Sequence, residues 1–184
     1  MYFVLPTATF YIYSYFSGLE GALGKPEDGG LTDITVFAPR DDAFVRLAHQ
    51  LSDFTGGNFK SNDEADAFGY IAEVLKALAP TLGTDLTGLV TIILQYHVAN
   101  KRIVFMDEAR SGKKKAMITT LYDDMMIMVE MAMKTPYNDM RMRMIHEADG
   151  QSFRYPKLHN KFIDIKTCNG RLNVIKDVLI PLDV

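Results

Sequence analysis

Apolar residues in the first half of the chain recur with the period of an α-helix. Four of them have the i, i+3, i+4, i+7 spacing of one helix face: Phe44, Leu47, Ala48 and Leu51. Asp41 precedes this set and is the expected N-cap. Ser61 and Glu64 have the spacing of a capping box, which predicts a second helix, and a third is expected near Asp85. A further helix is expected over residues 9–23.

The pattern changes after residue 96, where alternating and continuous apolar runs are typical of β-strands. Strands are expected at residues 118–121, 125–133, 141–145, 162–165 and 172–180. Residues 35–37 form an earlier short strand that Pro39 ends, since proline cannot donate to a ladder. Asn169-Gly170 is a hairpin signal, so the last two strands are expected to pair.

Composition indicates one globular domain and excludes several classes of protein. The 184 residues are 48% hydrophobic and 23% charged, enough to bury a core without disulfides. The net charge of −3 argues against a general nucleic-acid binder, which needs a basic face. Cys168 stands alone, so no internal disulfide can form, and we expect it to be a small buried apolar residue. No segment reaches the roughly 20 apolar residues of a membrane-spanning helix.

Catalytic and metal-binding patterns are not found in the sequence. The histidines lack the i, i+4 partner or the nearby carboxylates of a metal site, and no nucleophile-base pairing is legible. Acidic pairs such as Asp41-Asp42 are explained by caps and turns. We therefore expect no enzyme activity, no bound metal and no cofactor.

Three segments together resemble the fasciclin domain family. They are TVFAPRDDAF at residues 35–44, LQYHV at residues 94–98, and residues 164–181, which begin DIKTCNG. The resemblance implies an α+β fold with a wedge-shaped or barrel-like β-sheet flanked by helices, in which residues 35–37 and 172–180 lie in the same sheet. It also implies a single domain over residues 1–184, with an N-terminal helix and loop at 1–30 and a helical insertion at 52–88.

The same resemblance implies a non-enzymatic interaction module. Such a module acts in protein-protein adhesion or as a docked subunit of a larger extracellular or membrane-associated assembly. A secreted, cell-surface or other exported compartment follows, and a plastid lumen or the periphery of a membrane complex is the alternative location. Tyr96-His97 and Asp164-Ile165 match family pairs associated with adhesion. From the residues alone, a structural role is favoured for both pairs: Tyr96 in the core, His97 in a local hydrogen bond, and Asp164-Ile165 entering a hairpin.

Two segments carry more apolar residues than one core-facing side needs. One is the N-terminal aromatic stretch with Phe3, Phe10, Tyr13 and Phe16; the other contains Met126 and Met128. Eight of the eleven methionines lie between residues 125 and 144, and methionine suits adaptable apolar surfaces. The surplus predicts contact with a protein partner, a lipid or a pigment. Binding of a hydrophobic small molecule such as a carotenoid is the alternative function.

Overall fold

A computed structural model describes residues 20–111, 115–122, 126–130, 158 and 162–181. The helices, with two 3₁₀ turns, are α2 (Glu20–Leu23), η1 (Pro26–Asp28), α3 (Asp41–Thr55), α4 (Glu64–Leu78), η2 (Ala79–Leu82), α5 (Leu86–Tyr96) and α6 (Phe105–Arg110). The strands are β1 (Ile34–Pro39), β2 (Val98–Ala99), β3 (Lys115–Thr119), β4 (Met126–Glu130), β5 (Ile165–Lys166) and β6 (Gly170–Ile175). The fold is therefore of the α+β class, as the sequence predicts.

The strands form two sheets. The larger sheet has the order β2-β1-β6-β5, in which β1 pairs in parallel with β6 and the other pairs are antiparallel. The smaller sheet is the antiparallel pair β3-β4. Every residue of β1 is buried, as expected for a strand covered on both faces. The prediction that residues 35–37 and the final strand share a sheet is confirmed.

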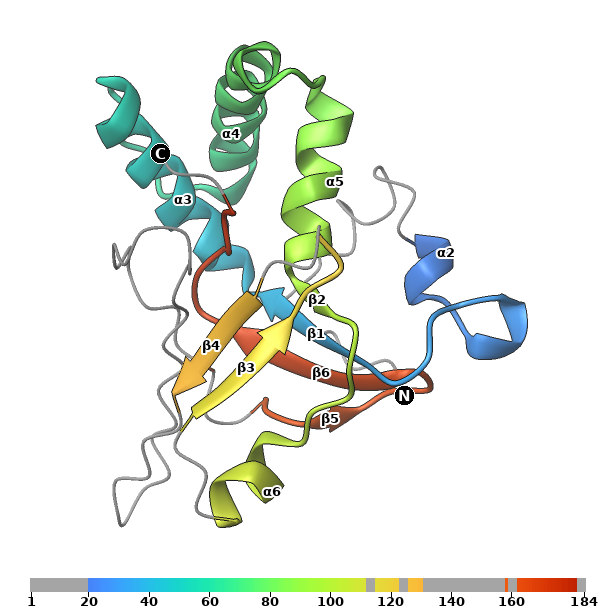
Figure 1. Cartoon of the computed structure of the whole chain (residues 1–184). Coiled ribbons are helices and arrows are strands. Elements are labelled where there is room, and N and C mark those ends of the chain that lie inside the picture. The colour runs from blue at the N-terminus through green and yellow to red at the C-terminus, as the bar shows by residue number, and fades with distance from the viewer. Residues whose placement is uncertain (1–19, 112–114, 123–125, 131–157, 159–161, 182–184) are drawn as a thin grey trace.

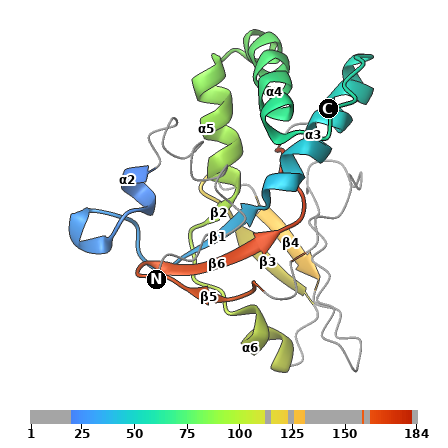
Figure 2. The same ribbon diagram turned by 180° about the vertical axis from the view of Figure 1, so that it is seen from behind.

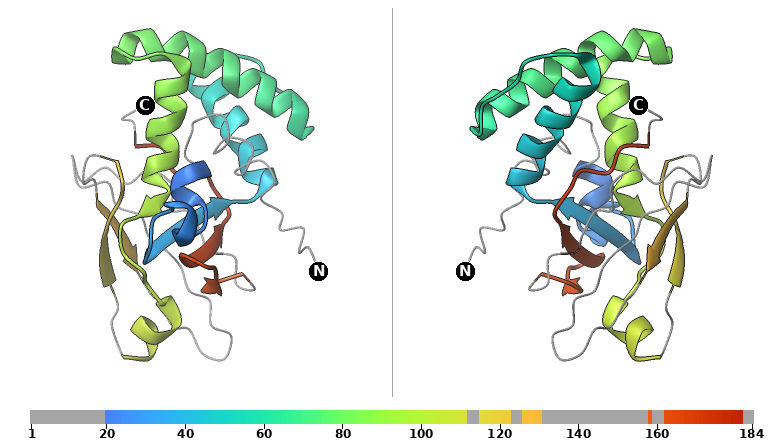
Figure 3. Two further views of the ribbon diagram at one scale, coloured as in Figure 1. Left: turned by 90° about the vertical axis from the view of Figure 1, so that its right-hand side faces the viewer. Right: turned by 90° about the vertical axis from the view of Figure 1, so that its left-hand side faces the viewer.

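The two sheets face each other, and three helices pack together beside them (Figures 1 and 3). One core lies between the sheets and contains Phe37, Tyr96, Phe105, Ile127 and Ile175, among others. A second core lies among α3, α4 and α5. Seen from behind, α2 lies near the turn that joins β5 to β6 (Figure 2). There the Asn169 side-chain amide donates to the carbonyl oxygens of Leu23 and Gly24.

The helix faces follow the predicted periodicity, but two of the caps do not. Phe44, like the other apolar residues of its face, is buried against α4. The N-cap of α3 is Arg40, whose extended backbone precedes the first turn, so Asp41 lies inside the helix. The cap of α4 is Asp63, which accepts from two backbone N–H groups, whereas Ser61 bonds to Asp66 instead. The helix α5 begins beside Asp85 as expected, and the Asp85 side chain caps it.

Strand boundaries differ from the sequence expectation for physical reasons. The final strand ends at Ile175, not at residue 180, because the chain then turns away from the sheet onto the helices. The preceding strand begins at Ile165 because Asp164 has a φ of 55°, which extended backbone cannot have. The strand predicted at residues 118–121 occupies Lys115–Thr119, and the one predicted at 125–133 occupies Met126–Glu130 within the described residues.

Some predictions are corrected and some fall outside the described residues. Cys168 is exposed rather than buried, because it lies in the turn between β5 and β6. The strand expected at residues 141–145 and most of the helix expected at 9–23 lie outside the described residues. In the part of the chain that the structure describes, no single helix is long and apolar enough to cross a membrane. Within the same described residues, the bent pair formed by Glu64–Leu82 and Leu86–Tyr96 is long and apolar enough when the two helices are taken together, by length and composition alone.

Candidate functional site

Tyr96 and His97 lie where α5 ends and β2 begins. Tyr96 is the last residue of the helix and His97 its C-cap. The Tyr96 ring is buried between the two sheets, beside Phe37 and Phe105, and burial raises the pKa of its hydroxyl to about 12. The backbone of His97 continues into the sheet, since its carbonyl oxygen accepts from the Phe37 N–H at 2.8 Å. The pair therefore joins the helical core to the sheet.

Both ring nitrogens of His97 make hydrogen bonds inside the protein. Nε2 accepts from the backbone N–H of Leu179 at 3.0 Å, so it carries no proton. Nδ1 must then be the protonated nitrogen, and it donates to the carbonyl oxygen of Ile93 at 2.7 Å. His97 is 1% exposed. The local structural hydrogen bond predicted for His97 is thus observed, together with a second bond that reaches the C-terminal segment.

Acid is expected to destabilise the domain through His97. Burial lowers its pKa from 6.5 to about 4, although the bond to Ile93 opposes the shift. The unfolded chain therefore binds the proton more readily, and the stability that neutral His97 provides is present above pH 6.5 and declines as pH falls toward 4. Between pH 7 and pH 5, the free energy of unfolding should fall by about 2 kcal/mol from this residue.

Urea denaturation at several pH values measures this effect. The control is His97→Gln, which removes the titrating group, so the difference between the two proteins isolates the contribution of His97. Equal pH dependence in both proteins would show that His97 is not the source.

Asp164 and Ile165 also serve the fold. The Asp164 carboxylate accepts from the backbone N–H groups of Phe105 and Met106, at 2.9 and 2.8 Å, and so caps the start of α6. Its own N–H donates to Asn173 Oδ1 at 2.8 Å. Ile165 pairs with Leu172 and is half-buried. The Asp164 carboxylate is therefore engaged internally at the point where the hairpin begins.

The outer face of the β3-β4 sheet exposes methionine. Ile118, Ile127 and Val129 point into the core and are almost fully buried. Met117 and Met126 are 49% and 36% exposed, which places them on the other face of the alternating strands. Met128 is the backbone partner of Met117. We call Met117 and Met126 the methionine face. The sequence analysis selected Met126 and Met128 but missed Met117. The alternation of β3, in which Met117 lies next to the buried Ile118, could have identified it.

The remaining predicted site residues belong to the N-terminal aromatic stretch. Phe3, Phe10, Tyr13 and Phe16 lie outside the described residues. Among the residues that are described, no group of three or more His, Cys, Asp or Glu side chains could hold a metal ion.

An apolar pocket lies among α3, α4 and α5, next to His97. Its walls include Phe44, Leu47, Ile71, Ile93 and Val178. Its volume is about 30 Å³, which corresponds to roughly two water molecules. A polyene or another large ligand would enter this pocket only if the surrounding helices moved apart.

Comparison with solved structures supports the architecture. The chain is similar to a FAS1 domain pair from the insect cell adhesion molecule fasciclin I, with a TM-score of 0.57 and 15% sequence identity. The alignment covers 94% of this chain and 44% of that one, so the chain spans less than half of the matched structure. No family model and no curated protein sequence matches the chain. At this identity the likeness shows the fold alone: a mixed α+β, FAS1-like domain.

Proposed function

We propose that the chain is a non-enzymatic interaction module of the adhesion type, which binds a partner protein through its methionine face. The single observation that carries the proposal is the exposure of Met117 and Met126 on a sheet whose other face is core. These two side chains are not part of the buried core between the sheets. Methionine is flexible and polarisable, so it can adapt to an apolar partner surface.

The internal roles of the family-associated pairs support the same placement. Tyr96 is buried, both His97 nitrogens are bonded within the chain, and the Asp164 carboxylate caps α6. These side chains are engaged in the fold, which leaves partner contact to the surface. The structural neighbour is itself a cell adhesion molecule, which favours adhesion over catalysis. The proposal implies an exported, cell-surface or lumenal location.

Binding of a carotenoid stays the alternative prediction. The pocket beside His97 is apolar, but its volume of about 30 Å³ does not favour a large pigment. A visible absorption spectrum of the protein purified from its natural source tests this alternative directly. A polyene absorption band that co-elutes with the protein in gel filtration would support the pigment function.

Replacing Met117 and Met126 by serine is expected to weaken adhesion strongly while changing stability little. Removing two apolar side chains from an interface should weaken binding about tenfold or more. Because both side chains are already partly in water, the free energy of unfolding should change by only about 0.5 kcal/mol. The measurement is attachment of cells to a surface coated with the protein, alongside urea denaturation of each variant.

The matched control is Leu82→Ser, which removes an apolar side chain that is 50% exposed on η2, outside the methionine face. This variant should support attachment as the unchanged chain does. Equal attachment by the double variant Met117→Ser/Met126→Ser and the unchanged chain would contradict the proposed surface. Absence of attachment to the unchanged chain would count against the adhesion function itself.

A further inference from the structure

The six residues after β6, 176–181, form a strap across the helical layer. Val178 and Ile180 pack against the core of α3, α4 and α5, whereas Leu179 faces the core between the sheets and is buried. Val178 is also one wall of the pocket beside His97. Displacing the strap would therefore open this pocket.

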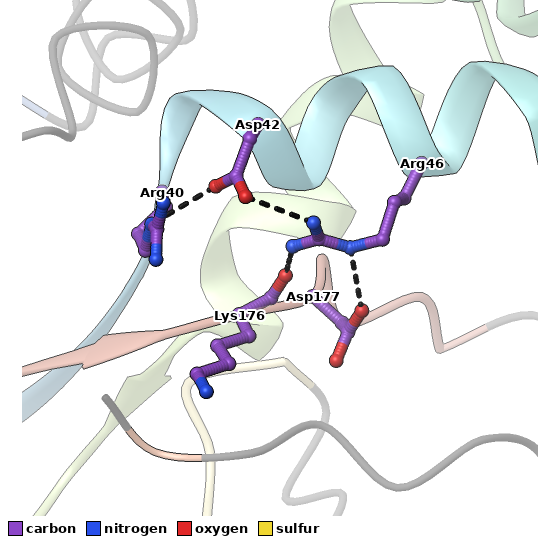
Figure 4. Close-up of polar contacts among 5 residues, drawn as sticks. All are labelled: Arg40, Asp42, Arg46, Lys176 and Asp177. Atoms are coloured by element: carbon purple, nitrogen blue, oxygen red, sulfur yellow. Dashed lines mark hydrogen bonds and ion pairs between the residues drawn. The ribbon is translucent and has the colours of Figure 1, made fainter. Parts of the chain in front are cut away.

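Arg46 of α3 is the first polar anchor of the strap (Figure 4). Its guanidinium donates to the carbonyl oxygen of Lys176 and to the Asp177 carboxylate, the latter at 3.2 Å. It also pairs with Asp42 at 2.9 Å, one turn earlier in the same helix. Burial lowers the pKa of Arg46, but these two carboxylates more than offset it, and the net direction is upward. This anchor keeps its cation at any pH at which the domain is folded.

His97, the C-cap of α5, is the second anchor, and it acts only while its Nε2 carries no proton. Its Nε2 accepts the Leu179 N–H only while the ring is neutral, because a protonated imidazole has two N–H donors and no acceptor. Protonation would place one N–H against another inside the core. The strap therefore has one anchor whose cation does not titrate and one that acid removes.

We infer that protonation of His97 detaches the strap from α5, which makes residues 176–181 an acid-sensitive latch over the apolar pocket. The latch is separate from the methionine face and goes beyond the proposed interaction function.

Burial disfavours an imidazolium at His97 while the latch is closed, although the hydrogen bond from Nδ1 to the Ile93 carbonyl oxygen favours one. Nε2 faces the Leu179 N–H, and β1 and the strap contribute Pro39 and Val178 to the pocket beside the ring. Besides His97, the residues lining the pocket from α3, α4 and α5 are all apolar. The charged groups that hold the strap lie at its other end, away from His97. There Arg46 forms ion pairs with Asp42 and Asp177.

Opening the latch returns the His97 ring to water, and the difference in its pKa between the open and closed states determines how strongly opening depends on pH. A hydrated histidine has a pKa near 6.5, against about 4 when buried here. The ratio of open to closed strap should therefore rise about tenfold per pH unit between these values. Opening of the strap alone leaves the pairing of β1 with β2 and β6 intact, so a local opening does not require unfolding.

Amide hydrogen exchange, expressed as protection factors that correct for intrinsic pH dependence, tests the latch. From pH 6.5 to 4.5, protection of Leu179 should fall about tenfold per pH unit, and at each pH it should stay below that of β1 residues, which exchange only when the whole domain unfolds. In His97→Gln, the side-chain carbonyl can accept the same N–H without titrating, so protection of Leu179 should not depend on pH. Constant protection in the unchanged chain, an equal fall in His97→Gln, or protection of Leu179 equal to that of β1 residues at every pH would overturn the inference.

Asp177→Asn provides a second test that keeps His97 in place. Loss of the charge weakens the Arg46 anchor, so the strap should open more at every pH with the same pH slope. Unchanged protection of Leu179 in this variant would show that Arg46 does not hold the strap, and a lost pH slope would show that His97 is not the acid-sensitive anchor.

Discussion

Tyr96→Ala is expected to lower the free energy of unfolding by about 3–5 kcal/mol, the usual cost of truncating a buried large aromatic residue. Tyr96 is 3% exposed and lies where α5, the larger sheet and the β3-β4 sheet meet. Its ring contacts a cluster that includes Phe37, Phe105 and Ile127, so its removal leaves a cavity that no single neighbour can fill. Equilibrium denaturation in urea, followed by circular dichroism, gives the change.

Phe54→Ala is the matched control for the truncation of an aromatic ring. Phe54 lies near the end of α3 and is 56% exposed, so its removal creates no cavity and should change stability by only about 0.5 kcal/mol. If Tyr96→Ala cost no more than Phe54→Ala, Tyr96 would not be the residue that joins the helices to both sheets.

Gly170→Ala is the second substitution with a large expected effect, because it would force two paired strands apart. A Cβ at Gly170 would overlap the carbonyl oxygen of Ile34, and it would lie 2.8 Å from the Ile34 carbonyl carbon. Ile34 is the register partner of Gly170 at the start of the β1-β6 pair. Backbone cannot yield as a flexible side chain can, so we expect a loss of about 3 kcal/mol, at the upper end for overpacking.

Gly69→Ala is the matched control for adding a methyl group to glycine. Gly69 is exposed within α4, and a Cβ there would meet nothing within 4 Å. Because glycine is unfavourable inside a helix, this variant should be more stable by about 0.5–1 kcal/mol. Thermal denaturation should show a lower melting temperature for Gly170→Ala and a higher one for Gly69→Ala than for the unchanged chain. A Gly170→Ala protein as stable as the unchanged chain would contradict the close approach of β1 and β6.

The features that depend on neighbouring residues could be read from the sequence. The apolar spacing in α3 identified its buried face, because i, i+3 and i+4 positions share one side of any helix. Asn169-Gly170 marked the hairpin between β5 and β6, since the turn is specified locally. The matched segments also predicted that β1 and the final strand lie in one sheet, which the β1-β6 pairing confirms.

Features that join distant parts of the chain could not be read in this way. Asp164 caps α6 across 58 to 59 positions, and no local pattern identifies a helix cap supplied from a hairpin. His97 receives the Leu179 N–H across 82 positions. The apolar residues after Ile175 looked like more strand, but they leave the sheet because the helical core offers them burial.

By itself, the sequence determined the helix faces and the turn at Asn169-Gly170, because each depends on residues close together in the chain. It also indicated that the methionine-rich segment has more apolar residues than a core needs. Only the tertiary structure decided which residues of β3 and β4 face water: Met117 and Met126 are exposed, whereas Ile127 and Val129 are buried. The physical reason is that alternation separates the two faces of a strand, but what packs against each face is decided by distant segments.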